Sequence, residues 1–334
     1  MKYVRRQPLD VLTIGSATRD IFVASSHFEK LVSATAPDGF SACLPMGSKI
    51  SVDLMEQASG GGATNGAVTF ARFGLRTACL SRIGSDTAGE DVVREIAREG
   101  VDISHMQWDA KEKTASSIIF LSGHGSRCVL VSRGASQHIE TSVLKKGIPA
   151  NWLYLTSLGG KMTQLKEVFA AAKKSGTHIA WNPGNGELEY GYKVLEPFLK
   201  QTDILLLNRE EAADLAHVAP RMLEEMQLLL SPIPKLALVI TDGARGAYAF
   251  SRGVVWHVGT IKGKRINTTG AGDAFNSGFV ASLIKEGDIF RALHIAALNA
   301  FGVVTHMGAK RGILKHYPKA SELNLVKVRE ISRL

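Results

Sequence analysis

The sequence has little cysteine, and the cysteines present form no recognisable pattern. Cys43, Cys79 and Cys128 are too few and too widely spaced for a disulfide framework. No CxxC or Cys/His spacing of the kind that holds a structural metal occurs. Unpaired cysteines are typical of a reducing compartment, so we expect a cytoplasmic protein.

Long apolar runs and long basic runs are also missing. No window of 18 uninterrupted apolar residues occurs, and the basic N-terminus lacks an apolar segment of signal-peptide length. We therefore expect no membrane partner. The net charge is +9, yet no four consecutive Lys or Arg appear, which argues against a nucleic-acid-binding arm. We interpret the positive charge as a solvated basic surface.

Several familiar catalytic motifs are absent. No GxGxxG follows the first predicted strand, and no GxxxxGK[ST] occurs, so the dinucleotide fingerprint and the P-loop are both excluded. HExxH and GxSxG are missing as well. Any phosphate-binding element must therefore have another form.

The 334 residues are 45% apolar, which is enough for a sizeable core. Short apolar runs alternate with helix-like segments, and this rhythm predicts an α/β fold whose mostly parallel sheet is covered by helices on both faces. Strands are predicted at 10–15, 77–83, 151–156, 177–182, 203–208 and 236–241, and helices at 63–73, 88–99, 162–174, 209–217, 271–286 and 289–304.

Two regions interrupt this rhythm. Residues 16–58 are rich in small residues, proline and glycine, and residues 114–132 read as a hairpin with a glycine-containing turn. Together they predict a small sheet that serves as a lid over a ligand cleft. No linker marks a domain boundary, so we expect one domain over residues 1–334.

The segment Asn267–Ser277, NTTGAGDAFNS, is the most informative part of the sequence. Gly270 and Gly272 flank Ala271 where a predicted helix begins, so backbone N–H groups can face a ligand without an intervening side chain. These groups lie at the positive end of the helix dipole and suit the charge of a phosphoryl group. Asp273, in the first turn, is placed to accept a proton from an attacking hydroxyl. Alternatively, it merely caps the helix.

Two more segments suit a polar ligand. Ser59–Asn65, SGGGATN, allows close backbone approach at Gly60 and Gly61, and Asn65 offers both a donor and an acceptor. Asp20 follows the first predicted strand, in a region where ligands of open α/β sheets gather. The alternatives are a tight turn with a capping residue at Asn65 and a loop salt bridge at Asp20.

These segments together resemble the PfkB, or ribokinase-like, family of carbohydrate kinases over residues 9–317. Both family signatures are present, in order, at residues 60–92 and 267–279. Shorter similar elements lie between them: RGASQHI at 133–139, NPG at 182–184, NREE at 208–211 and TDGARGAY at 241–248. The resemblance implies a three-layer αβα sandwich with a mostly parallel central sheet and a small β-sheet lid.

The resemblance also implies roles by position, with ATP and Mg²⁺ as cofactors. Asp273 matches the catalytic base, and the anion hole corresponds to Gly270, Ala271 and Gly272. The acceptor's hydroxyls would be held by Asp20, Gly60, Gly61 and Asn65. Glu211 would act on Mg²⁺ through water, an ion that usually keeps several waters. The nucleotide would be bound by Asn182, Asn208, Thr241, Gly243 and Gly246. Asn208 and Glu211 also fit an N-cap with a carboxylate three residues on, and both roles can hold at once.

One position departs from the family pattern. The family usually has Asp where this chain has Asn267, and in several members that Asp helps form a monovalent-cation site. Asn keeps a carbonyl acceptor but removes the charge, which argues against potassium activation. The helix 289–304 would line the adenine, with Asn299 interpreted as a structural residue.

We therefore expect an ATP-dependent kinase that phosphorylates a hydroxyl of a sugar, with Asp273 as general base. A nucleoside kinase of the same family is the main alternative. A non-catalytic sugar- or nucleotide-binding regulator and a kinase of vitamin-like heterocycles are further ones. The unpaired edges of the lid make a homodimer through the lid a further expectation.

Overall fold

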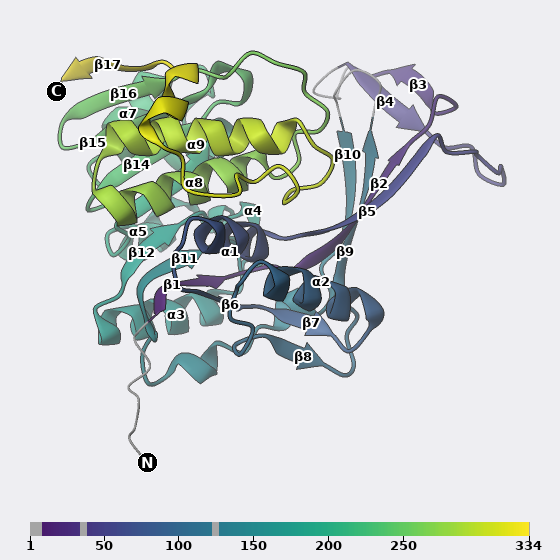
Figure 1. Cartoon of the computed structure of the whole chain (residues 1–334), viewed down its shortest axis with the longest axis horizontal. Coiled ribbons are helices and arrows are strands. Elements are labelled where there is room, and N and C mark those ends of the chain that lie inside the picture. Colours follow the sequence, from purple (N-terminus) through teal and green to yellow (C-terminus); the bar gives the residue numbers. More distant parts are fainter. Residues whose placement is uncertain (1–8, 34–38, 122–126, 334) are drawn as a thin grey trace.

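The computed structural model describes residues 9–33, 39–121 and 127–333. The main body is a nine-stranded sheet with helices on both faces (Figure 1). Its strands are β1 (Leu9–Ile14), β6 (Thr77–Leu80), β11 (Ala150–Leu155), β12 (His178–Trp181), β13 (Ile204–Asn208), β14 (Ala237–Thr241), β15 (Ala247–Ser251), β16 (Val254–Val258) and β17 (Val328–Arg333). They lie in the order β17-β16-β15-β14-β13-β12-β11-β1-β6.

The sheet is parallel from β6 to β14 and antiparallel from β14 to β17. The parallel strands are continuous apolar runs because helices cover both of their faces. In β13, Leu205 packs in one core cluster and Leu206 packs in the cluster on the opposite face. The expected mostly parallel α/β fold is therefore confirmed.

Three layers result from these two clusters. One face of the sheet is covered by α3 (Met162–Ser175), α4 (Asn185–Leu188), α5 (Gly191–Leu199), α6 (Arg209–Ala216) and α7 (Leu223–Leu230). The other is covered by α1 (Gly62–Arg72), α8 (Ala271–Glu286) and α9 (Ile289–Val304). A third cluster joins α1 to α2 (Thr87–Arg98) near the end of the sheet. Within the described part of the chain, no helix combines the length and apolarity needed to cross a membrane.

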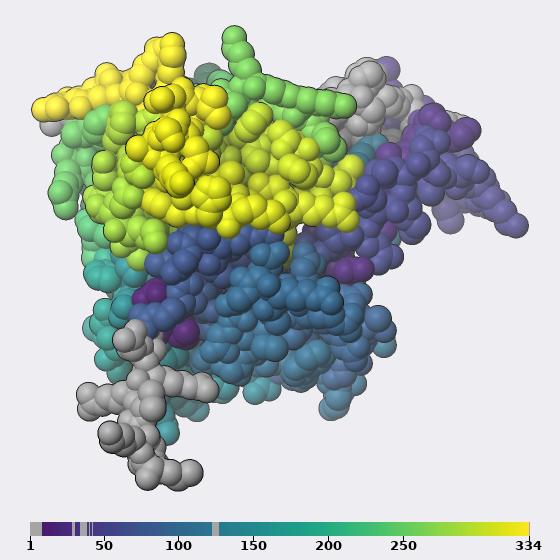
Figure 2. All heavy atoms as spheres, in the orientation of Figure 1, coloured from purple at the N-terminus to yellow at the C-terminus, as the bar shows by residue number. Residues whose placement is uncertain are grey.

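A second, four-stranded sheet projects from this body (Figures 1 and 2). It contains β2 (Thr18–Ala24), β5 (Leu54–Gly60), β9 (Ala115–Leu121) and β10 (Arg127–Ser132), in the order β10-β9-β2-β5. A two-stranded sheet of β3 (Glu29–Val32) and β4 (Phe40–Cys43) lies beyond its outer end. We call the four-stranded sheet the lid. The expected hairpin is β9 with β10, and its turn at 122–126 lies outside the described residues.

One expected strand is divided in two. The apolar run 77–83 predicts a single strand, but β6 ends at Leu80, and β7 (Arg82–Gly84) pairs with β8 (Gln107–Asp109) in a separate sheet. The chain leaves the main sheet where Arg82 forms ion pairs with Asp109 and Glu140. The helices expected at 271–286 and 289–304 have the bounds of α8 and α9.

Candidate active site

The turn before α8 brings the glycine-rich segment to the N-terminus of a long helix. Gly270 is the N-cap and adopts a left-handed conformation with φ of 81°. A Cβ added there would lie 2.4 Å from Ala309 Cβ, so only glycine fits. At Gly272, by contrast, a Cβ would meet no atom of the described residues within 4 Å. Ala271 N donates to the Thr268 carbonyl oxygen at 3.2 Å. Since first-turn N–H groups have no partner within their helix, the N–H groups of Gly272 and Asp273 are the donors that the start of α8 offers to an anion.

Asp273 lies in this first turn and is bound from across the cleft. Asn65 Nδ2 of α1 donates a 2.8 Å hydrogen bond to Asp273 Oδ2. Burial raises the pKa of Asp273, while the Asn65 hydrogen bond and the charge of Lys310 oppose that rise. A carboxylate with a raised pKa that still ionises is suited to accept a proton.

Hydrogen bonds also fix the backbone behind Asp273. Ser277 Oγ donates to the Asp273 carbonyl oxygen at 2.6 Å, and it lies 2.9 Å from the hydroxyl oxygen of Thr69 on α1. Asn299 Nδ2 of α9 donates to Thr69 Oγ1 at 3.2 Å and to the Ala274 carbonyl oxygen at 2.8 Å. Asn299 is fully buried in this network, which links α1, α8 and α9.

Asp20 of the lid and the glycines of β5 face the same space. Thr18 Oγ1 donates to Asp20 Oδ1 at 3.0 Å, and a Cβ at Gly60 would lie 2.0 Å from Asp20 Oδ2. Gly61 has a φ of 98°, and a Cβ there would lie 2.4 Å from the Ser16 carbonyl oxygen. Burial raises the pKa of Asp20, and its charge in turn adds to the raised pKa of Asp273.

The side-chain oxygen of Asn65 is buried without a hydrogen-bond partner among the described residues. The residue is 3% exposed, and its Oδ1 accepts no hydrogen bond from any described residue. An unpaired buried acceptor is costly unless a ligand donates to it. The structure therefore groups Asp20, Asn65 and Asp273 around a space where a hydroxyl-bearing ligand would satisfy Asn65.

The residues expected to bind nucleotide follow three neighbouring strands. Asn182 follows β12 and is tied to Leu206 of β13 and to Asn276 of α8 by its side-chain amide. Asn208 and Thr241, the last residues of β13 and β14, are register partners. The carboxyl ends of parallel strands are where ligands of open α/β sheets bind.

The two glycines after β14 differ in the space available for a side chain. Gly246 has a φ of 96°, and a Cβ there would lie 1.9 Å from the Val258 carbonyl oxygen, so the turn itself demands glycine. Gly243 has a φ of 52° with open space around it. Between them, Arg245 and Arg209 of α6 both donate to Asp242, which ties the start of α6 to this turn.

Asn208 and Glu211 form a reciprocal cap at the start of α6. Asn208 Oδ1 accepts from Glu211 N, and Glu211 Oε2 accepts from Asn208 N, both at 2.8 Å. Burial raises the pKa of Glu211 to about 7, and the charges of Asp273, Glu210 and Asp214 add to it. A carboxylate is a hard oxygen ligand of the kind that Mg²⁺ prefers, directly or through water. Within residues 9–33, 39–121 and 127–333, no three acidic, His or Cys side chains are grouped so that they could hold a metal ion.

Asn267 uses its side-chain amide within the protein. Its Oδ1 accepts from Thr269 N at 2.9 Å, and its Nδ2 lies 3.6 Å from Met307 Sδ. The residue is 5% exposed. The neutral amide therefore shapes the turn that leads to Gly270, and supplies no charge to a cation.

Sequence reasoning missed two cationic residues near the site. Lys310 is 3% exposed, and its pKa is lowered to about 8 by burial, against the opposing charges of Glu95, Asp20 and Asp273. Arg127 of β10 donates from the lid to Thr268 Oγ1, beside the turn before α8. Neither residue belongs to a motif or a periodic pattern, since only the folded packing brings them close to Asp273.

Comparisons with known proteins identify the family to which this chain belongs. The family model described as pfkB family carbohydrate kinase matches residues 36–315. The ribokinase of Haemophilus influenzae is 28% identical over 262 residues, which cover 77% of this chain and 84% of that protein. The nucleoside kinase of Methanocaldococcus jannaschii is 24% identical over 259 residues, covering 76% of this chain and 82% of that one.

Solved structures show the same fold. The Arabidopsis thaliana ribokinase complexed with ribose and ATP has a TM-score of 0.74 at 20% identity, covering 92% of this chain and 96% of that one. The Methanocaldococcus jannaschii nucleoside kinase has a TM-score of 0.73 at 21% identity, and the match covers 95% of this chain and 98% of that one.

Proposed function

This chain belongs to the PfkB family of carbohydrate kinases, and we propose that it transfers the γ-phosphoryl group of ATP to a sugar hydroxyl with Asp273 as general base. One observation carries the proposal. The Asp273 carboxylate lies in the first turn of α8, is held by Asn65 across the cleft, and is flanked by open space at Gly272. Base and anion-binding donors are thus adjacent.

In the proposed mechanism, ionised Asp273 accepts the proton of the acceptor hydroxyl as its oxygen attacks the γ-phosphorus. The new oxygen–phosphorus bond forms while the bond to the β-phosphate oxygen breaks, and ADP leaves. The N–H groups at the start of α8 stabilise the charge on the transferring group. Bound Mg²⁺ supplies charge neutralisation on the ATP phosphates, and Glu211 would hold it through water.

Each side of the cleft has its own task. Asp20 and Asn65 bind acceptor hydroxyls, while Gly60 and Gly61 leave the room that Asp20 Oδ2 and the Ser16 carbonyl oxygen occupy beside them. Asn182, Asn208, Thr241, Gly243 and Gly246 bind ATP. The lid, whose strands lie in residues 16–58 and 114–132 of a single domain 1–334, excludes water that would otherwise compete as nucleophile.

A nucleoside acceptor is the second candidate. Asp20 and Asn65 would bind the ribose of a nucleoside as well as a free sugar, and the similar Methanocaldococcus jannaschii protein is a nucleoside kinase. A panel of sugars and nucleosides with ATP and Mg²⁺, read by ADP release, separates the two. Preferred turnover of a nucleoside would overturn the sugar assignment, and no phosphorylation of any acceptor would overturn the kinase assignment.

We further propose that a second copy of the chain covers the outer face of the lid. Met55, Ile118 and Leu130 lie on one face of β5, β9 and β10 and are 63%, 38% and 55% exposed. A contiguous apolar face of this kind marks an interface. Sedimentation of the wild type should show a dimer that Ile118→Asp dissociates, and a monomeric wild type would contradict the proposal. We place the reaction in the cytoplasm, where ATP and free thiols are both found.

A further inference from the structure

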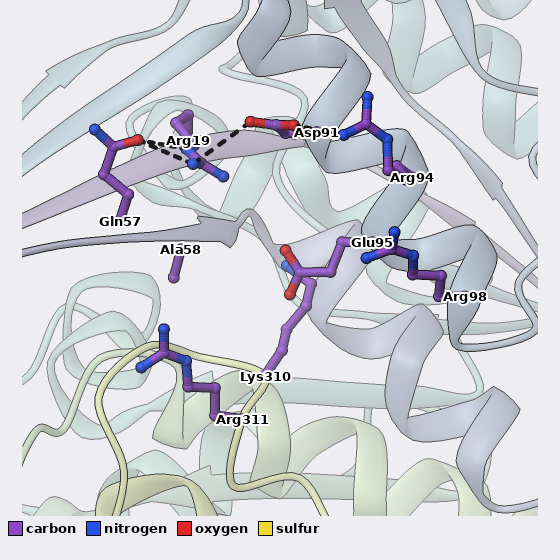
Figure 3. A pocket seen from close by; sticks show the side chains of 9 residues that line it. All are labelled: Arg19, Gln57, Ala58, Asp91, Arg94, Glu95, Arg98, Lys310 and Arg311. Atoms are coloured by element: carbon purple, nitrogen blue, oxygen red, sulfur yellow. Dashed lines mark hydrogen bonds and ion pairs between the residues drawn. The ribbon is translucent and has the colours of Figure 1, made fainter.

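A cavity opens where α2, the edge of the lid and the loop after α9 meet (Figure 3). Its volume is about 390 Å³, within the roughly 300–1,000 Å³ typical of small-molecule pockets. Arg19 lies on β2, Gln57 and Ala58 on β5, and Lys310 and Arg311 on the loop. The remaining lining residues, Asp91, Arg94, Glu95 and Arg98, lie on α2.

The lining of this cavity is strongly basic. Five cationic side chains face two carboxylates, so three positive charges are in excess. Asp91 is shared between Arg94 at 3.3 Å and Arg19 at 3.6 Å. Arg311 is paired outward with Glu56 at 2.7 Å. Arg98 forms no ion pair with any described carboxylate, so its charge is available to a ligand.

Lys310 supplies a second, independent observation. It is 3% exposed, and its Nζ makes no hydrogen bond to any described residue. The carboxylates of Glu95, Asp20 and Asp273 favour its charged form, Glu95 most strongly, yet no ion pair within 4 Å joins Lys310 to any of them among the described residues. A buried, unpartnered ammonium is costly, and a bound anion would remove that cost.

The loop that carries Lys310 touches both parts of the proposed active site. Ala309 packs against Gly270 so closely that no Cβ fits there. A Cβ at Gly308 would lie 2.9 Å from Ala58 of the lid, and Arg311 is paired with Glu56 on the same strand. An anion bound to Lys310 would therefore contact a loop that packs against both the turn before α8 and the lid.

We propose that this cavity binds a small oxyanion, a phosphate or carboxylate group, between Lys310 and Arg98. The cavity holds more than a bare ion, so it suits a phosphate ester or a small organic acid. The oxyanion is either a substituent of the acceptor or part of a separate effector. This inference goes beyond the proposed phosphoryl transfer, because the site contains none of the residues assigned to acceptor hydroxyls or ATP.

Binding is tested first without catalysis. Inorganic phosphate, and then a simple phosphate monoester, is titrated into the wild type and into Arg98→Ala, Lys310→Met and Arg329→Ala while the melting temperature is followed. Arg329 is an exposed residue on β17, at the opposite edge of the sheet, and serves as the matched control. We expect Arg98→Ala and Lys310→Met to bind about tenfold more weakly than the wild type, since a charge-assisted hydrogen bond contributes that much. Arg329→Ala should bind as tightly as the wild type.

If phosphate binds at the turn before α8 instead, Arg98→Ala should bind it as tightly as the wild type does. Equal protection in all four proteins, or no protection of the wild type, would therefore overturn the proposal. Should Lys310→Met fail to fold, Arg98→Ala alone still decides, because Arg98 is exposed and its loss disturbs no packing.

Kinetics then identify the source of the oxyanion. If it belongs to the acceptor, Arg98→Ala raises KM about tenfold for anionic acceptors and leaves kcat, and neutral acceptors, unchanged. If it belongs to an effector, inorganic phosphate changes the rate with a neutral acceptor in the wild type and not in Arg98→Ala. Failure of the proposed kinase activity itself would leave the phosphate titration unaffected, so the two failures are distinguishable.

Discussion

Asn65 Nδ2 and Asp273 Oδ2 are joined by a 2.8 Å hydrogen bond that crosses from α1 to the first turn of α8. The two residues are separated by more than 200 positions in the chain. The bond fixes the Asp273 carboxylate against α1, and it lowers the pKa of Asp273 and so favours its ionised form. Both the position and the pKa of the proposed base therefore depend on a residue of the other signature.

Removing this hydrogen bond should shift the pH profile. Asn65→Leu leaves the burial of Asp273 in place and removes a bond that lowers its pKa, so the acidic limb of kcat/KM should move to higher pH. The profile of kcat/KM against pH, measured beside wild type, checks this. Reduced activity with an unmoved acidic limb would show that Asn65 acts only by binding the acceptor.

Asp273→Asn removes the base while keeping a similar shape. Turnover should fall by roughly 10²- to 10⁴-fold, the usual contribution of general base catalysis, and KM for ATP should change little. Steady-state kinetics and a nucleotide-binding titration measure the two effects. Near-normal kcat would remove Asp273 from this role.

Gly60→Ala should disturb Asp20. The new Cβ would lie 2.0 Å from Asp20 Oδ2, so the carboxylate must move away from its present position. KM for the acceptor should then rise about tenfold or more, because a charge-assisted hydrogen bond is lost. Gly259→Ala is the matched control, since its Cβ meets nothing within 4 Å. A comparable rise in that control would point to a general loss of structure.

Substitutions of Asn208 separate capping from nucleotide binding. Serine is a good N-cap, so Asn208→Ser should keep the stability of α6, whereas Asn208→Ala should cost about 1 kcal/mol. If the amide also binds ATP, Asn208→Ser raises KM for ATP at unchanged melting temperature. Unaltered kinetics in this variant would leave Asn208 with the cap alone.

Lys310 should make stability depend on pH in an unusual direction. Its pKa of about 8 in the folded protein lies below the ordinary 10.5, so the unfolded chain binds more protons between these values. The folded state should therefore gain stability as pH rises from about 8 to about 10.5, by up to roughly 3 kcal/mol. Lys310→Met should lack this gain and be the more stable protein at pH 7.

Urea unfolding at several pH values between 7 and 10 measures the difference between wild type and Lys310→Met. Lys262→Met, at an exposed position, controls for the loss of a surface charge. A constant difference across this range would show that the lysine is not buried in solution.

Periodicity predicted the layers because burial on both faces makes a parallel strand apolar throughout, as in Ile204–Leu207. The same apolar pattern wrongly predicted a single strand over residues 77–83, because apolar Leu80 and Ile83 lie on either side of the point where the chain changes sheets. Apolar content records burial but does not say which sheet buries the strand.

The glycine-rich turns and Asp273 could be predicted because each depends on a local backbone requirement. Lys310 and Arg127 could not, because their surroundings come from segments far apart in the chain. Lys310 is enclosed only once α2, the lid and the turn before α8 have packed together. The hydrogen bond between Asn65 and Asp273 is likewise a property of the assembled helices.

The residues that we propose for acceptor binding and those that we propose for ATP binding come from different parts of the chain. Asp20, Gly60 and Asn65 all precede residue 70, whereas the residues around Asn182, Asn208 and Thr241 come from the later strands β12–β14. Under the proposed assignment, acceptor preference and ATP use are encoded by separate stretches of the chain. During evolution, changes confined to the early segment could therefore alter which alcohol is phosphorylated without altering the residues proposed to bind ATP.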